Sequence, residues 1–362
     1  MFFTILTFIF FILIEFFLRF IKFKKSGKWE ILALNIENKK KFLLFESHPY
    51  LGYTKSKNNI NPRFPTNNAG FAGSRDVNVS SDLNTVRIVI CGGSTVEQND
   101  LDMAPKFDQE LTWPKVMEDN LNKSNNEENY EVINAGCGGY TILESTIHLL
   151  VKCLPYKPNY AILYHGINDA WCIQAAPDFA PDYTHARKPP VFPQNNGFLS
   201  ILPNFRISFI YQYSLLYLLQ FFEKPSGLLH YISQNYSYDM KFDRVSTAIK
   251  TYEDYLTSFC SIALSHNITP ILIPWIYNKE MINKPHNINN WDKEKFIELL
   301  EINNQSTRRI ANETDGVILL ELSDNEKDNF RQNDWVHFTK KGLKKVGRDV
   351  AIKFLKIHNK KI

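Results

Sequence analysis

The feature that most constrains the fold is a repeated alternation of short apolar runs with amphipathic segments along the chain after residue 85. The apolar runs are rich in β-branched residues and occupy 86–93, 130–136, 159–166, 269–275 and 316–322. Apolar residues recur at helical spacing in 112–122, 142–154, 292–312 and 340–357. Strands that alternate with helices in this way predict a five-stranded parallel sheet covered by helices on both faces.

In such sheets the ligand site lies beyond the carboxyl ends of the strands, so the residues that follow each strand are the first candidates for a site. The first strand ends in the turn Gly92-Gly93-Ser94. A serine on a tight turn from strand to helix exposes its hydroxyl, and nearby backbone N–H groups point into the same space. Ser94 is therefore a candidate nucleophile, although a Gly-Gly-Ser sequence is more often only a turn.

Two further strands end in residues suited to binding a negatively charged oxygen. The second is followed by Asn134-Ala135-Gly136-Cys137-Gly138-Gly139, in which the glycines let the backbone approach a ligand closely. The third is followed by His165-Gly166-Ile167-Asn168-Asp169. The Asn168 side-chain amide is a candidate oxyanion donor. The alternative is that Asn168 only stabilises a turn or caps a helix.

A candidate general base lies near the C-terminus, just before the final predicted helix. Asp334 precedes His337 by three residues in the sequence DWVHF. Within one tight loop, such an aspartate can hold an imidazole in the tautomer that accepts a proton from a serine. The other histidines have no comparable partner in sequence, although His165 lies next to the proposed site.

Taken together, these blocks resemble those of the SGNH hydrolase superfamily, also called GDSL-like lipases and acylhydrolases, in its membrane-associated branch. The serine block is CGGSTVE, the glycine block NAGCGGYT, the asparagine block HGIND and the histidine block DWVHFTKKG. The resemblance covers 86–172 and 316–357, and the lead-in NNAGFAG at 67–73 is similar to a segment that precedes membrane-associated members. It implies a three-layer, flavodoxin-like α/β domain with a five-stranded parallel sheet.

The resemblance also implies roles for individual residues. Ser94 would be the nucleophile, His337 the base and Asp334 the residue that orients it. The oxyanion hole would consist of the Ser94 N–H, the Gly139 N–H and the Asn168 side chain, with Gly138 as the alternative to Gly139. Gly93 stands where the family name has aspartate, a departure that does not involve the reacting groups.

The N-terminal segment 1–21 is apolar except for Thr4, Thr7, Glu15 and Arg19, and it is just long enough to span a membrane. It has neither a basic region before it nor a small-residue cleavage site after it, so we expect an uncleaved single-pass anchor. An amphipathic helix lying in the membrane plane is the alternative. The basic cluster KFKKSGK follows immediately and favours a cytoplasmic location for the rest of the chain.

We therefore divide the chain into an anchor at 1–21, a basic flank and lead-in at 22–85, and a catalytic domain at 86–362. An insertion at 173–245 interrupts that domain. It is proline-rich at first and very apolar at 207–222, where about 16 residues favour a lid or packing helix over a second membrane contact.

Charge and cysteine content exclude other classes. Residues 1–28 hold five basic side chains and one acidic, and the rest of the chain has 37 of each, so the folded domain offers no basic patch for nucleic acid. The five cysteines are scattered and have no metal-type spacing, so we expect small buried side chains, with no metal or cofactor.

The sequence thus predicts a serine ester hydrolase that removes an acyl group, which we expect to be acetyl, from a carbohydrate or lipid-linked substrate. Its partners would be that small-molecule or glycan ester and, through the N-terminal helix, the membrane. Two alternatives stay open: an O-acyltransferase that uses the same triad, and a non-catalytic binding module on the same fold.

Overall fold

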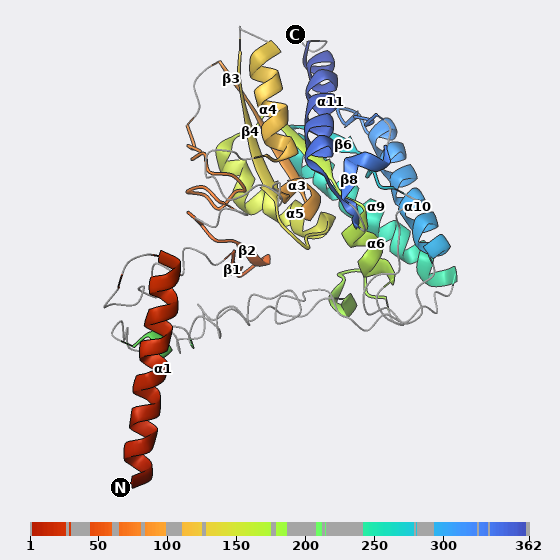
Figure 1. The fold of residues 1–362 in the computed structure, drawn as a ribbon. Helices are drawn as coiled ribbons and strands as arrows, with labels where there is room; N and C mark the ends of the chain where they lie inside the picture. Colours follow the sequence, from red (N-terminus) through yellow and green to blue (C-terminus); the bar gives the residue numbers. More distant parts are fainter. Residues whose placement is uncertain are drawn as a thin grey trace.

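A computed structural model describes residues 2–26, 29, 44–59, 65–80, 84–98, 111–124, 128–174, 179–186, 208–211, 214, 242–278, 280, 293–323, 326–331 and 334–359. Its centre is a five-stranded parallel sheet in the order β4-β3-β5-β6-β7 (Figure 1). The strands are β3 (Thr85–Gly92), β4 (Asn129–Gly136), β5 (Tyr160–Tyr164), β6 (Thr269–Ile273) and β7 (Ile318–Leu319). Counted along the chain this order is 2-1-3-4-5, the flavodoxin-like arrangement. The predicted fold class is confirmed.

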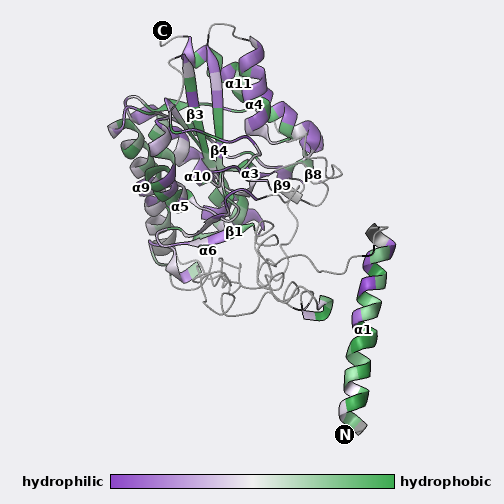
Figure 2. Cartoon of the chain, turned by 90° about the vertical axis from the view of Figure 1, so that its left-hand side faces the viewer, coloured by the Kyte–Doolittle hydropathy of each residue, from purple (hydrophilic) through white to green (hydrophobic). Residues whose placement is uncertain are grey.

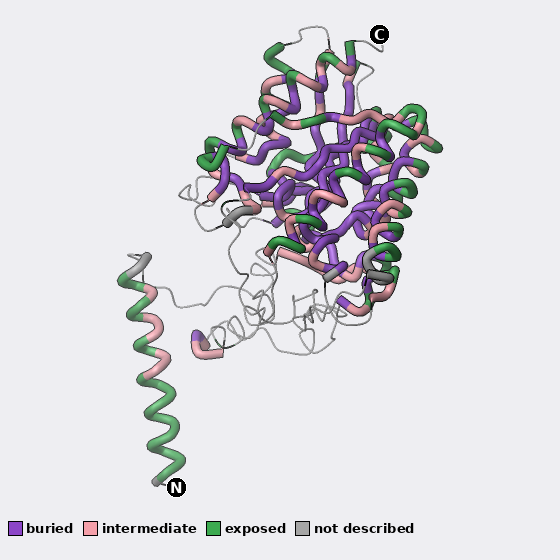
Figure 3. The backbone as a smooth tube through the Cα atoms, turned by 90° about the vertical axis from the view of Figure 1, so that its right-hand side faces the viewer, coloured by how far each residue is buried: buried purple, intermediate pink, exposed green. Residues whose placement is uncertain are grey.

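Helices cover both faces of the sheet, because successive strand residues point to opposite sides. Ile88 and Ile90 of β3 share one core with α4 (Trp113–Ser124) and α11 (Lys340–His358). Val89 and Cys91 share the other core with α5 (Ile142–His148) and α9 (Phe242–Ser265). The sheet and the inner faces of these helices form the buried centre of the domain (Figure 3).

The remaining elements are short, apart from α10 (Lys293–Glu313), which packs on α9. A π-helical turn (Leu149–Cys153) and a 3-10 turn (Leu154–Tyr156) continue α5. The others are α3 (Ser94–Glu97), α6 (Ile167–Gln174), 3-10 turns at Thr184–Ala186 and Lys327–Asn329, and the paired strands β8 (Phe330–Arg331) and β9 (Asp334–Phe338). The segment that holds His337 is therefore a strand where a loop was expected.

The lead-in also contains structure that the sequence did not reveal. β1 (Phe45–His48) and β2 (Gly52–Lys55) form an antiparallel hairpin. These strands have only four residues each, too few for a visible alternation of apolar and polar side chains. Beyond the hairpin, the Ala72 N–H donates to the Asn134 carbonyl at 3.0 Å, so the lead-in pairs with β4.

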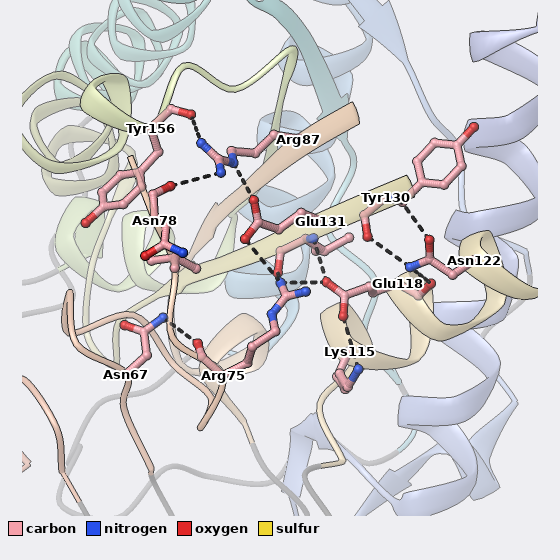
Figure 4. Close-up of polar contacts among 12 residues, drawn as sticks. Asn67, Arg75, Asn78, Arg87, Lys115, Glu118, Asn122, Tyr130, Glu131 and Tyr156 are labelled. Atoms are coloured by element: carbon pink, nitrogen blue, oxygen red, sulfur yellow. Dashed lines mark hydrogen bonds and ion pairs between the residues drawn. The ribbon is translucent and has the colours of Figure 1, made fainter. Parts of the chain in front are cut away.

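A chain of charged side chains fastens the lead-in to the edge of the sheet (Figure 4). Arg75 Nη2 lies 2.8 Å from Glu118 on α4, and Arg87 Nε lies 2.5 Å from Glu131 on β4. Arg87 is only 2% exposed, and it also donates to the carbonyls of Asn78 and Tyr156. A buried guanidinium is stable only when it is paired in this way, so the lead-in packs against the domain at fixed positions.

The N-terminal helix α1 (Phe2–Ser26) lies apart from the sheet (Figure 1). Phe3–Lys24 is the span in the described part of the chain that is long and apolar enough to cross a membrane. Its apolar side chains are exposed along nearly its whole length (Figures 2 and 3). A helix whose apolar side chains are exposed on most sides suits a lipid environment.

Glu15, the acidic residue of α1, has several hydrogen-bond and ion-pair partners. Its carboxylate pairs with Arg19 at 2.9 Å and accepts the N–H groups of Phe209 and Ile210 at 2.6 and 2.9 Å. Residues 208–211 and 214 are the described part of the apolar run 207–222. Within it, Phe209 and Ile210 contact α1. Most of the run lies outside the described residues, and so does much of the predicted insertion at 173–245.

Candidate active site

The proposed nucleophile lies at the carboxyl end of the central strand. β3 ends at Gly92, and Ser94 is the first residue of α3. The turn between them has no room for side chains. A Cβ atom at 92 would collide with Val96, and one at 93 would lie 2.6 Å from Asn168 Nδ2. Glycine at 93 therefore leaves room for the Asn168 amide beside the serine turn.

Ser94 and His337 come together although 243 positions separate them. Ser94 Oγ lies 2.9 Å from His337 Nε2, and both residues are half-buried. This distance is within the range needed for a histidine to take a proton from a serine. His337 lies on β9, and the backbone of Asp334 begins the same strand. The Asp334 side chain lies outside the described part of the structure, so its role stays a prediction.

Asn168 lies in the first turn of α6, directly beside the serine turn. Its Nδ2 donates to the Tyr140 carbonyl at 2.7 Å, and the residue is 9% exposed. An amide nitrogen carries two hydrogens, so one can serve this bond while the second serves a ligand. The bond to Tyr140 also fixes the direction of the amide, which a donor to a developing charge requires.

The glycine block supplies two candidate N–H donors, and the structure separates them. The Gly138 N–H donates to Glu97 Oε2, so that donor is already used. Gly139 has φ +82, a backbone conformation that residues other than glycine rarely adopt. A Cβ at 138 would lie 4.0 Å from Ser94 Cβ, which places this loop beside the serine. We retain Gly139 as the proposed donor.

Several residues next to the site were missed by sequence reasoning. Gln98 donates to the Phe338 carbonyl at 2.6 Å and accepts the Phe338 N–H at 2.9 Å, so it holds the residue after His337. Glu97 pairs with Lys55 of the hairpin in a fully buried ion pair. Glu97 ends the serine block and Gln98 follows it, but no sequence signal links them to Lys55 or Phe338.

Cys137 lies within the glycine block and is a possible competing nucleophile by position. Burial, followed by the negative charge of Glu97, raises the pKa of its thiol far above the ordinary value. A thiol reacts as its thiolate, so Cys137 stays unreactive. All five cysteines are free and buried, as predicted.

The hydrogen-bond partner of His165 is Ser145, not Ser94 of the proposed site. Its Nε2 lies 2.7 Å from Ser145 Oγ, and its Nδ1 lies 3.8 Å from Asp169 Oδ2. All three residues are buried. Within the described ranges, no cluster of three or more His, Cys, Asp or Glu side chains is arranged to hold a metal ion.

No protein-family profile and no curated protein matches the sequence. Solved structures similar to this chain include a lipase/acylhydrolase from Enterococcus faecalis, with 16% identity and a TM-score of 0.41 over 75% of this chain and 96% of that one. An acetyl xylan esterase from Geobacillus stearothermophilus has 14% identity and a TM-score of 0.40, over 75% and 93%. A Desulfitobacterium hafniense protein assigned to the G-D-S-L lipolytic family has 13% identity and a TM-score of 0.38, over 74% and 98%.

Likeness at such low identity does not transfer a substrate or a mechanism to this chain.

Proposed function

We propose that this protein is a membrane-anchored serine ester hydrolase of the SGNH type. The observation that carries the proposal is the 2.9 Å separation of Ser94 Oγ and His337 Nε2 at the carboxyl end of the sheet. Asn168 and the Gly138–Gly139 loop lie beside Ser94. A nucleophile, a base and oxyanion donors in one place are the components that acyl transfer to a serine needs.

In the proposed reaction, Ser94 Oγ attacks the ester carbonyl carbon while His337 Nε2 takes the serine proton. The carbonyl oxygen becomes negative and is stabilised by the N–H groups of Ser94 and Gly139 and the Asn168 amide. As the first residue of a helix, Ser94 has an N–H without an intrahelical acceptor. His337 then gives the proton to the departing alcohol, leaving an acyl-serine.

Water resolves the acyl-serine by the same steps in reverse. His337 takes a proton from water, the hydroxide oxygen attacks the acyl carbon, and Ser94 leaves with the proton returned by His337. We propose that Asp334, from the same strand as His337, orients the imidazole and stabilises its charged form. The products are a carboxylic acid and an alcohol.

For the substrate we propose a short acyl group, acetyl in the first instance, on a carbohydrate or a lipid-linked molecule. The support is the apolar helix α1, which would keep the domain next to a membrane. The full-length chain in detergent is to be assayed with p-nitrophenyl esters of increasing acyl length and with acetylated sugars. Hydrolysis that depends on Ser94 is expected to be fastest for acetyl. Transfer of the acyl group to an added sugar instead of water would identify an acyltransferase.

We further propose a cytoplasmic location for the domain, from the basic residues Lys22, Lys24, Lys25 and Lys28 after the apolar segment. Alkaline phosphatase reaches its active folded state only outside the cytoplasm, because it needs disulfides. A fusion of that enzyme to the C-terminus is expected to be inactive in cells. Strong phosphatase activity would place the domain on the opposite side of the membrane.

A further inference from the structure

The β1–β2 hairpin of the lead-in contacts the glycine block of the proposed site. Tyr53 and Lys55 of β2 are buried, at 4% and 2% exposed. The Tyr140 hydroxyl donates to the Tyr53 carbonyl at 2.5 Å, and the two rings meet edge to face with centroids 5.3 Å apart. The hairpin thus packs against Tyr140, the residue that follows Gly138 and Gly139.

Both backbone polar groups of Gly138 are held by side chains. Its N–H donates to Glu97 Oε2, and its carbonyl accepts the Tyr53 hydroxyl. The carbonyl of Gly138 and the N–H of Gly139 belong to one planar trans peptide, so they point in opposite directions. The Tyr53 hydroxyl, by holding the carbonyl, therefore determines the direction of the Gly139 N–H.

The Tyr53 hydroxyl also accounts for the need for glycine at 139. A Cβ atom there would lie 2.6 Å from Tyr53 Oη, and the positive φ would strain any larger residue. The close packing leaves the peptide between Gly138 and Gly139 little room to rotate.

Glu97 connects this loop to the nucleophile. It is the last residue of α3, the helix that Ser94 begins. Its carboxylate binds the Gly138 N–H with one oxygen and Lys55 with the other. Lys55 and Glu97 are both almost fully buried, and a buried carboxylate without a partner would be costly. Lys55 therefore supplies the positive charge beside the buried Glu97 carboxylate, which also accepts the Gly138 N–H.

We propose that Tyr53, supported by the Lys55–Glu97 ion pair, is a positioning residue that directs the Gly139 N–H toward the oxyanion. The inference rests on the proposed ester hydrolysis at Ser94. It makes the hairpin, which lies outside the sheet domain predicted from sequence, part of the machinery of the site. None of the three side chains is assigned contact with the substrate.

The first test compares Tyr53→Phe with Tyr50→Phe in the full-length chain, assayed with p-nitrophenyl acetate in detergent. Tyr50 lies on the turn of the same hairpin and is 72% exposed, so its variant controls for loss of a hydroxyl. Deleting an oxyanion donor costs about 10²–10³ in kcat, and a misdirected donor keeps part of its effect. We expect Tyr53→Phe to lower kcat by about 10- to 100-fold with KM unchanged.

The second test addresses the ion pair. Lys55→Met leaves Glu97 without its charge partner and is expected to lower both kcat and the melting temperature. Lys55→Met with Glu97→Gln removes both charges but keeps an amide oxygen that can accept the Gly138 N–H. The double variant is therefore expected to recover kcat toward the wild-type value. A double variant that folds but stays as slow as Lys55→Met contradicts the proposed hold on Gly138.

The outcomes separate this inference from the proposed function. If the wild type neither hydrolyses any ester nor labels with a fluorophosphonate, the hydrolase proposal fails and this inference fails with it. If the wild type is active and Ser94→Ala is not, the hydrolase proposal stands. In that case a Tyr53→Phe variant with wild-type kcat overturns only the positioning role. A Tyr53→Phe variant that loses stability but keeps kcat also overturns it.

Discussion

In the described part of the domain, two serine–histidine pairs have similar Oγ–Nε2 distances and different surroundings. Ser94 Oγ and His337 Nε2 are 2.9 Å apart, and Ser145 Oγ and His165 Nε2 are 2.7 Å apart. The second pair even has an aspartate nearby, since His165 Nδ1 lies 3.8 Å from Asp169. By distance alone, Ser145 would be the better nucleophile.

Access and backbone donors distinguish the pairs. Ser145 is fully buried within α5, and its N–H donates to the Thr141 carbonyl at 3.0 Å. It offers neither an entrance for a substrate nor an N–H for an oxyanion. Ser94 is half-buried at the start of a helix, where the backbone N–H groups have no intrahelical acceptor. A serine–histidine contact is thus a site only where the fold leaves space for a substrate and places hydrogen-bond donors beside the serine.

The largest expected effect comes from deleting each serine in turn. Ser94→Ala should lower kcat by about 10⁶ and abolish fluorophosphonate labelling, because the nucleophile is gone. Ser145→Ala should keep kcat and labelling but lose about 1–3 kcal/mol of stability, because His165 loses a buried partner. Full labelling of Ser94→Ala, or loss of activity in a folded Ser145→Ala variant, would reverse the comparison.

A smaller effect is expected from Asn168→Ala. Loss of one oxyanion donor should lower kcat by about 10²–10³, or roughly 3–4 kcal/mol, with KM nearly unchanged. The bond to the Tyr140 carbonyl is lost as well, which should reduce stability by about 1 kcal/mol.

Asn304→Ala is the matched control for Asn168→Ala. The Asn304 amide binds the N–H and the carbonyl of Trp275 at 2.8 and 3.0 Å, a role within the fold. This variant should lose stability and keep kcat. Melting temperature and kcat measured on the same preparations decide the matter: a destabilised but fully active Asn168→Ala variant would remove Asn168 from the site.

The smallest effect concerns the support of His337. Gln98→Leu removes both bonds to the Phe338 backbone and should let His337 move relative to Ser94. A full 1 Å misplacement costs roughly 10²-fold, and we expect about a tenfold loss in kcat with KM unchanged. Gln98→Glu keeps an acceptor for the Phe338 N–H, so its kcat should lie between those of the wild type and Gln98→Leu. Equal kcat in all three proteins would mean that β9 holds His337 without Gln98.

Much of the fold could be predicted because it depends on local pattern. Buried parallel strands are continuous apolar runs, and β3 to β6 are found within two residues of the predicted starts. The rule that sites lie at strand ends also led to Ser94 and Asn168. By contrast, α6, α9 and the β1–β2 hairpin were not anticipated. The hairpin's four-residue strands are too short to have a period, and its burial comes from packing on the glycine block.

The sequence by itself determined the residue types that could react, because Ser94, Asn168 and His337 each follow a recognisable local motif. Only the tertiary structure decided which of them meet and that the Gly138 N–H donates to Glu97. It also decided that His165 faces Ser145 instead of the proposed site. The contacts of Tyr53, Lys55 and Gln98 likewise depend on residues 42 to 240 positions away, between which no sequence period exists. Helices and strands depend mainly on residues that are neighbours in the sequence, whereas a site depends on distances that arise only when the sheet has formed.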